Sequence, residues 1–494
     1  MFKSLTAEIL VDQNGKATNF PLLSFRSPNM RAFHMSWLSF MIAFFSWFAV
    51  PPLATAISSD LKISASDMYD SNVSAVAVTI VARIVVGPLC EHWGPRRVMV
   101  ALLVCGSIPA AMVGLVENGA GLIAIRCIIG ILGATFVPCQ FWATQMFSPA
   151  RVGTANALVG GWGNMGAGLS YLVLMGIFQG LQRVVSTGIA WRLTFLFPTL
   201  ACLIVAFMDF FLAVDSPNGD WLAVRRVERD TSVHGDASIQ SSGDEEKVQV
   251  TKIETYDTNI DRRTVFVLPK DQAHEVGSLQ DVRKDETFTQ TLASYGRTLM
   301  RPTVLILCCQ YACSFGIELS IDNIIGSVFL NTYKLEASTA AYIGSIFGLL
   351  NICSRFTGGL LSDTLAKKLQ LRGRILAQLI LMSLEGAFLI GFSFILDENL
   401  LYRAIIMMVC FSFFVQAVCG STYGIVPFVD PANTGKVMGL VGSFGNVGGL
   451  VFGLLFKSFG IQYHMSFLIL GICTLTSGIL GCALLRVQGR MLWN

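Results

Sequence analysis

Two arginines occupy equivalent places inside long apolar segments of this chain. Arg83 stands four residues before a glycine in RIVVGPLCEHW, and Arg355 stands four residues before a glycine in RFTGGLLSD. An arginine near the centre of a membrane helix costs roughly 2.5–3.5 kcal/mol, so a pair of them requires a compensating use. A guanidinium stays protonated and offers a planar donor fork to two oxygen atoms at once. The pair indicates either an anion site or two structural arginines that carboxylates neutralise near helix ends.

A second repeated pattern combines glycine with asparagine. GGWGNMGAG (160–168) and GSFGNVGGL (442–450) each place an asparagine, Asn164 or Asn446, between glycines that share its helical face. Small residues let helices approach closely, whereas an asparagine amide can donate hydrogen bonds to an oxyanion. We therefore expect the asparagines to bind a ligand and the glycines to pack helices. The packing glycines are Gly160, Gly163, Gly166, Gly168, Gly442, Gly445, Gly448 and Gly449.

The composition is that of a membrane protein. Of the 494 residues, 53% are hydrophobic and only 14% are charged, whereas a soluble domain has nearer a quarter charged residues. Apolar runs of about 20 residues recur, each long enough to cross a bilayer as a helix. The runs cover 33–57, 71–90, 98–116, 121–145, 154–180, 192–214, 302–328, 338–361, 375–396, 402–425, 435–457 and 464–485. The sequence predicts an all-α membrane protein with twelve transmembrane helices.

The repeats divide these helices into two pseudo-symmetric bundles of six. Each half has an arginine in its second helix and a glycine–asparagine motif in its fifth. Basic residues gather in the short loops EHWGPRR, SPARVG and DTLAKKLQLRGR, which places the termini and the central loop in the cytoplasm. The predicted parts are the N-terminal segment 1–32, the first bundle 33–214, the central loop 215–298, the second bundle 299–485 and the tail 486–494.

The central loop 215–298 is polar and carries about half of the 32 acidic residues of the chain. It lacks the composition for a packed core, so we expect it to be largely disordered. Its Ser238, Ser241 and Ser242 are candidate phosphorylation sites for a regulatory kinase.

Several motifs resemble a known family. GPLCEHWGPRR (87–97) is similar to the G-x-L-x-D-x-x-G-x-R loop of the major facilitator superfamily, with Glu91 in place of the aspartate. The two glycine–asparagine motifs resemble the nitrate signatures of the nitrate/nitrite porter family, which lie in its transmembrane helices 5 and 11. ILGATFVPCQFW (131–142), YACSFGIEL (311–319) and NICSRFTGGLLSD (351–363) look like the eukaryotic, high-affinity branch of that family.

The resemblance implies import of nitrate and nitrite across the plasma membrane by proton symport, with nitrate held by Arg83, Arg355 and the two asparagines. It also implies that aromatic rings line the nitrate cavity, here Phe136, Tyr311 and Phe315. Glu318 lies two helical turns after Tyr311, and an intramembrane acid is a candidate proton-coupling site. An ion pair between Glu318 and an arginine is an equal alternative. Arg126, Asp209 and Glu385 also lie within apolar runs, and we expect a structural polar partner for each.

Other functional classes fit less well. The sequence has no nucleophile motif, phosphate-binding loop or metal cluster, so we predict no enzyme activity, cofactor, metal or nucleic-acid partner. A nitrate/nitrite exchanger and a nitrate sensor built on the transporter fold remain as alternatives.

Overall fold

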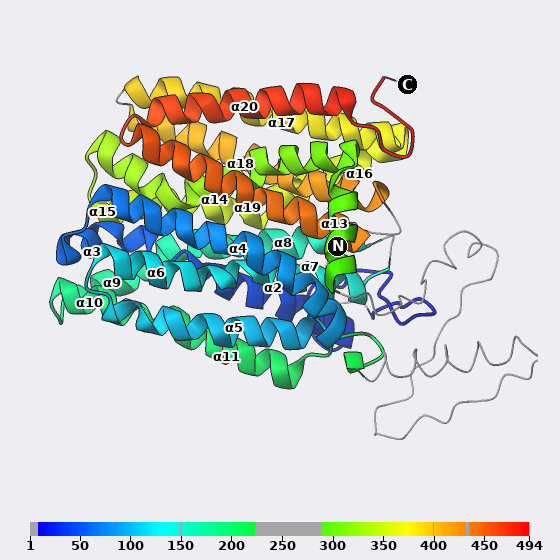
Figure 1. Cartoon of the computed structure of the whole chain (residues 1–494), viewed down its shortest axis with the longest axis horizontal. Coiled ribbons are helices and arrows are strands. Elements are labelled where there is room, and N and C mark those ends of the chain that lie inside the picture. The colour runs from blue at the N-terminus through cyan, green and yellow to red at the C-terminus, as the bar shows by residue number, and fades with distance from the viewer. Residues whose placement is uncertain (1–7, 149–150, 223–287, 399, 431–433, 494) are drawn as a thin grey trace, which may run out of the picture.

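The computed structural model describes residues 8–148, 151–222, 288–398, 400–430 and 434–493 (Figure 1). Twelve of its helical segments are long and apolar enough to cross a membrane, which confirms the predicted class and number. The only β pairing in these described ranges consists of isolated bridges. The expected serine phosphorylation sites Ser238, Ser241 and Ser242 lie outside the described residues.

Breaks within several spans divide them into consecutive helices. The first six spans are α2 (Pro28–Trp47) with η1 (Pro51–Leu53) and α3 (Ala54–Leu61); α4 (Ala65–Trp93); α5 (Pro95–Met112); α6 (Gly119–Ile129) with η3 (Gly130–Thr135) and α7 (Phe136–Met146); α8 (Val152–Leu169) with η4 (Ser170–Leu174) and α9 (Met175–Gln182); and α10 (Thr187–Thr194) with α11 (Leu196–Leu212). The last six are α14 (Pro302–Tyr333); α15 (Ala337–Leu349) with η6 (Leu350–Ile352) and α16 (Ser354–Leu369); α17 (Leu371–Ile395); α18 (Leu401–Ile425); α19 (Thr434–Phe459); and α20 (Tyr463–Leu484).

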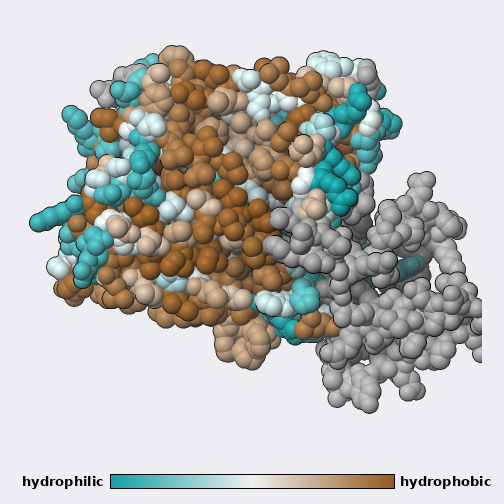
Figure 2. Space-filling view, viewed as in Figure 1, coloured by the Kyte–Doolittle hydropathy of each residue, from teal (hydrophilic) through white to brown (hydrophobic). Residues whose placement is uncertain are grey.

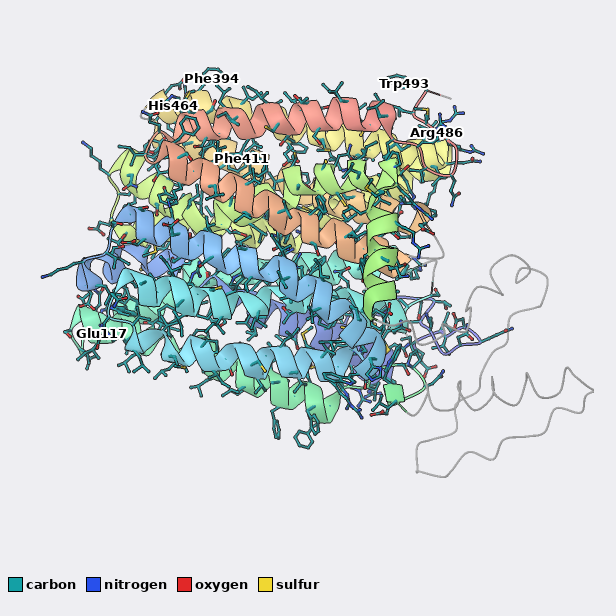
Figure 3. All side chains as sticks on the ribbon, viewed as in Figure 1. Glu117, Phe394, Phe411, His464, Arg486 and Trp493 are labelled. Carbon is teal, nitrogen blue, oxygen red and sulfur yellow. The ribbon has the colours of Figure 1, made fainter. Side chains whose placement is uncertain are left out.

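The spans lie side by side between two polar ends. Residues 213–222, α13 (Phe288–Leu299) and the C-terminal tail lie at the right of Figure 1, which we call the loop end. The helices α3, α9 and α10 lie at the opposite end, the far end. Side chains labelled in Figure 3 show the same division, with Glu117 and His464 at the far end and Arg486 and Trp493 at the loop end.

An apolar band crosses the visible face of the bundle between these ends. In Figure 2 hydrophobic side chains cover the middle of the visible face, and hydrophilic ones gather toward the two ends. Large apolar side chains on α11 point outward, among them Ile204, Phe207 and Phe211, which are 59–64% exposed. Such a continuous apolar surface is unfavourable in water and matches the hydrocarbon core of a bilayer, so this chain is a multi-pass membrane protein.

Parts of the predicted central loop are ordered against the bundle. Gly94 adopts a φ of +88°, and a Cβ there would lie 2.7 Å from Asp215 Oδ1, so the turn after α4 requires glycine. Asp215 accepts hydrogen bonds from the Arg96 backbone and side chain, although burial raises the pKa of this carboxyl. Residues 288–298, also within the predicted loop, form most of α13, where Ser294 Oγ accepts a hydrogen bond from Lys436 Nζ at 2.6 Å.

The two halves meet mainly along four spans. The α8 helix packs against α15 and α16, and α19 packs against α4. Arg83 lies on α4, Arg355 on α16, Asn164 on α8 and Asn446 on α19. The fold thus brings all four repeated polar residues to the helices that form the interface between the halves.

Candidate anion-binding site

Arg83 is 1% exposed and links the two halves through backbone carbonyls. Its Nε donates to the Gly133 carbonyl at 3.0 Å in its own half, and its Nη1 donates to the Gly442 carbonyl at 2.8 Å in the other. Its Nη2 has no hydrogen-bond partner among the described residues, and no salt bridge involves this side chain there. Arg83 therefore presents one unpaired nitrogen of a buried, positively charged guanidinium.

Arg355 is 2% exposed and has a different environment. Its Nη2 forms a buried ion pair with Glu318 Oε2 at 2.7 Å, and its Nε has no partner within the described part of the chain. Its guanidinium carbon lies 5.5 Å from the centre of the Phe315 ring, and that of Arg83 lies 5.3 Å from the same ring. The two guanidinium groups, one from each half, thus converge on one aromatic side chain.

Aromatic rings form the rest of this centre. Phe136 and Phe315 stack with centroids 6.2 Å apart, and Tyr311 stacks on Phe315 at 5.2 Å. Tyr423 on α18 contacts both Phe136 and Tyr311 edge to face at 5.7 and 5.3 Å. Tyr423 was not among the predicted site residues, because GSTYG (420–424) matches none of the repeated motifs. The Tyr311 hydroxyl is buried and has no partner in the described residues, so it is a further free polar group.

Each glycine–asparagine motif lies close to the arginine of the opposite half. A Cβ on Gly160 would lie 3.6 Å from Arg355 Cδ, and a Cβ on Gly442 would lie 3.8 Å from Arg83 Nη1. Each motif therefore approaches the arginine of the opposite half. Asn164, one turn after Gly160, is 1% exposed and neither of its amide atoms has a partner in the described structure. Asn446 Nδ2 donates to the Gly442 carbonyl at 3.2 Å, which leaves its Oδ1 unpaired.

The remaining motif glycines lie where backbones approach closely. A Cβ on Gly166 would lie 2.1 Å from the Met41 carbonyl oxygen on α2, and one on Gly448 would lie 2.2 Å from the Ala312 carbonyl oxygen on α14. Gly168 packs against α15, and an added Cβ there would lie 2.5 Å from Leu349 N. Gly163 lies against Phe40, Gly445 against Tyr311 and Phe315, and Gly449 against Leu319 and Val76.

Glu318 is held by several side chains in the centre of the C-terminal half. Besides the Arg355 pair, its Oε1 accepts from Asn351 Nδ2 at 2.7 Å, and Cys419 Sγ lies 3.6 Å from its Oε2. Of the two predicted roles, the structure contains the ion pair, and the proton-coupling role stays a prediction. Asn351 stands four residues before Arg355 in NICSR, a helical spacing that could have indicated its place beside the site.

Three other intramembrane charges have unlike surroundings. Arg126 donates to the Trp47 carbonyl and to the side chains of Asn72 and Asn323, and Asp209 accepts from Ser39 Oγ at 2.6 Å. Both therefore have the structural polar partners that we expected. For Glu385 that expectation is wrong, because neither carboxyl oxygen has a hydrogen-bond partner among the described residues.

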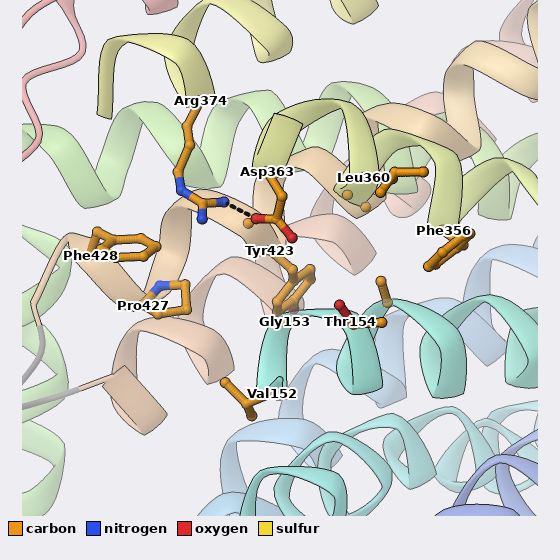
Figure 4. Close-up of a pocket in the computed structure, with 14 residues that line it drawn as sticks. Val152, Gly153, Thr154, Phe356, Leu360, Asp363, Arg374, Tyr423, Pro427 and Phe428 are labelled. Carbon is orange, nitrogen blue, oxygen red and sulfur yellow. Dashed lines mark ion pairs between the residues drawn. The ribbon is translucent and has the colours of Figure 1, made fainter. Parts of the chain in front are cut away.

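A cavity between the halves at the loop end has Tyr423 of this centre in its wall (Figure 4). Val152 and Thr154 of α8 line one side, and Phe356, Asp363 and Tyr423 of α16 and α18 line the other. Arg374 pairs with Asp363 at 2.7 Å beside the cavity and also lies against the Phe428 ring. Tyr423 belongs to both the cavity wall and the aromatic centre, so the cavity lies next to the site, although neither Arg83 nor Arg355 lines it.

Comparisons with known proteins agree with this architecture. Residues 36–453 match the family model described as Major Facilitator Superfamily. The chain is similar over its length to the solved structure "Partially occluded inward open conformation of the xylose transporter XylE from E. coli", with a TM-score of 0.62 and 11% identity, covering 94% of this chain and 99% of that one. At this identity the likeness shows the fold alone.

Sequence relatives are more specific. The "High affinity nitrate transporter 2.7" of Arabidopsis thaliana is 33% identical over 94% of this chain and 85% of the relative. "Nitrate transporter 2.2" of Chlamydomonas reinhardtii is 33% identical over 89% of this chain and 75% of the relative. "Nitrate/nitrite transporter NrtP" of Picosynechococcus sp. is 26% identical over 85% and 83%, respectively. The chain therefore belongs to the major facilitator superfamily and, within it, to the nitrate/nitrite porter family, on the branch of the eukaryotic high-affinity nitrate transporters.

Proposed function

We propose that this protein imports nitrate and nitrite across the plasma membrane by proton symport with alternating access. The observation that carries the proposal is the convergence of Arg83 and Arg355, from opposite halves, on the Phe315 ring. Relatives named as nitrate transporters support nitrate as the substrate, and the cyanobacterial relatives named as nitrate/nitrite transporters support nitrite.

Nitrate fits the chemistry of this centre. It is a flat anion whose charge is spread over three oxygens, and a guanidinium edge can donate to two such oxygens. Arg83 Nη2 and Arg355 Nε are the unpaired donors, and Asn164 and the Tyr311 hydroxyl are unpaired polar groups in the same interior. Two guanidiniums and the single Glu318 carboxylate leave one positive charge in excess, which a monovalent anion balances.

The Glu318–Arg355 pair offers a way to couple nitrate to protons. An anion that binds Arg355 competes with Glu318 for the same guanidinium, and it also repels the carboxylate through its charge. Glu318 then gains stability by taking up a proton. Importing a monovalent anion into a cell with a negative interior costs about 2.3 kcal/mol per 100 mV. Two protons imported with each nitrate make the net transported charge positive, so the membrane potential then drives uptake.

The two ends of the bundle differ in the contacts between the halves, and this difference supports alternating access. At the far end Lys457 pairs with Asp70 at 2.5 Å, and the Tyr171 hydroxyl donates to the Asp322 carbonyl at 2.8 Å, both between the halves. At the loop end the cavity of Figure 4 separates them. The basic loops favour a cytoplasmic loop end, with both termini inside the cell. We infer an inward-facing state in which Arg83 and Arg355 are still covered. Its far-end contacts break when the carrier opens outward.

Uptake by the purified protein in proteoliposomes tests the proposal. Labelled nitrate should accumulate against its gradient when the outside is acidic, with no anion inside, and accumulation should cease when the pH gradient is collapsed. Uptake that requires internal nitrite and ignores the pH gradient would instead identify an exchanger. Specific nitrate binding without any flux would identify a sensor.

A further inference from the structure

Arg126 on α6 is a further buried arginine at the boundary of the two halves, outside the central site. Its exposure is 1%, and its acceptors among the described residues are uncharged. Nη1 donates to the Trp47 carbonyl at 2.7 Å, which is available because Pro51, four residues later, has no N–H. Nη2 donates to Asn72 Oδ1 at 2.6 Å, and Nε has no partner in the described part of the chain. Within these ranges Arg126 is a buried cation with neutral partners.

One contact of Arg126 crosses between the halves. Nη2 also donates to Asn323 Oδ1 of α14 at 3.3 Å, which is longer than its bond to Asn72. The amide of Asn323 is held by its own helix, because Nδ2 donates to the Leu319 carbonyl at 2.8 Å. Trp47 on α2 and Asn72 on α4 belong to the same half as Arg126. Separation of the halves at the far end therefore removes Asn323 and leaves Arg126 with its other two partners.

The position of Arg126 is on the far-end side of the central site. Its partner Asn72 stands eleven residues before Arg83 on α4, a distance of about 16 Å along a helix with a rise of 1.5 Å per residue. Asp70, two residues before Asn72, pairs with Lys457 of the other half, and these two side chains are 34% and 33% exposed. Arg126 therefore lies between a partly exposed contact at the far end and the buried arginine of the central site.

The donors of Arg126 suit a planar oxyanion. Nε and Nη2 form one edge of the guanidinium plane, and such an edge can donate to two oxygens of one anion. Nη2 carries two hydrogens, so it can keep its bond to Asn72 while it binds an anion. In this state Asn323 Oδ1 supplies one neutral oxygen to Nη2. Nitrate supplies two oxygens and also the negative charge that a buried cation with neutral partners requires.

We propose that Arg126 is an outer anion-binding site, which binds nitrate or nitrite when the halves separate at the far end and which Asn323 closes afterwards. The inference rests on the proposed nitrate import by alternating access. Nitrate first binds Nε and Nη2 of Arg126 and then moves inward to Arg83 and Arg355. As the far end closes, Asn323 Oδ1 replaces the anion on Nη2, so the outer site releases nitrate toward the central one.

The R126Q substitution tests this site, because glutamine removes both the cation and its donor edge. Initial rates of labelled nitrate uptake are measured in proteoliposomes over a range of external nitrate. Loss of a charge-assisted hydrogen bond should raise the KM by about tenfold or more. R126K should also raise the KM, since an ammonium cannot replace the planar edge. R192Q is the matched control with an unchanged KM, because Arg192 lies at the far end but is paired with Asp60 at 2.6 Å.

The N323A substitution separates anion binding from a simple contact between the halves, because it removes that contact and leaves Arg126 in place. Its KM should stay near the wild-type value. A rise in N323A equal to that in R126Q would make Arg126 a closing contact and overturn the inference. A wild-type KM in R126K, or in a folded R126Q, would equally exclude the outer site.

Nitrate binding to the purified proteins shows whether the defect lies at the outer site. In the inward-facing state Arg126 is covered, so calorimetry should give R126Q and R126K the same nitrate Kd as wild type. A Kd that rises together with the KM would place the defect at the central site and contradict the inference. If wild type itself takes up no nitrate, the proposed function fails first.

Discussion

Replacing Arg83 with lysine removes donors while keeping the positive charge. The Arg83 guanidinium uses Nε and Nη1 for the Gly133 and Gly442 carbonyls, so only Nη2 remains for an anion. A lysine ammonium has a single nitrogen and cannot reach both carbonyls and an anion at once. Loss of one charge-assisted hydrogen bond costs about 1.5–3 kcal/mol, which corresponds to a nitrate Kd raised about ten- to 150-fold.

Calorimetric titration of nitrate into purified R83K measures this change directly. Arg192 provides the control, because its guanidinium also lies over an aromatic ring, that of Trp191 at 4.3 Å, but belongs to the Asp60 ion pair at the far end. R192K should leave the nitrate Kd unchanged. An R83K variant that is folded and binds nitrate within twofold of wild type would refute the reasoning.

Three further predictions follow from the same geometry. N164A should reduce nitrate uptake at normal membrane abundance, because both amide atoms of Asn164 are free for a ligand. N446A should reduce both uptake and membrane abundance, because Asn446 also donates a hydrogen bond to the Gly442 carbonyl. Quantitative surface labelling, measured together with uptake, distinguishes the two effects. G168A should slow transport by forcing α8 away from Leu349 on α15, and wild-type turnover in that variant would contradict the packing argument. Under voltage clamp in acidic medium, nitrate should evoke an inward current that grows with hyperpolarisation, whereas electroneutral uptake would exclude two protons per nitrate.

Much of the fold could be predicted from the sequence because a bilayer imposes simple requirements. A span needs about 20 apolar residues, so the twelve apolar runs identify the twelve helices. The repeated arginine and glycine–asparagine motifs identified the two halves, because each repeat fell at the same place in its own set of six. The shared face of Gly160 and Asn164 followed from helical periodicity alone.

The partners of the buried polar groups could not be predicted in the same way. Glu318 meets Asn351 and Arg355 because α14 and α16 pack together, and no spacing within either helix encodes that contact. The same limit applies to Glu385, for which an expected partner is absent from the described residues. Tyr423 was missed because its role depends on where α18 crosses the site.

A structure determined with nitrate bound tests the central claim most directly. The account predicts the anion between the halves, with its oxygens within hydrogen-bond distance of Arg83 Nη2 and Arg355 Nε and against the Phe315 ring. The R83K variant under the same conditions should show that position empty or weakly occupied. Nitrate bound elsewhere at saturating concentration, for instance beside Arg374 in the loop-end cavity, with the two central guanidiniums uncontacted, would contradict the account.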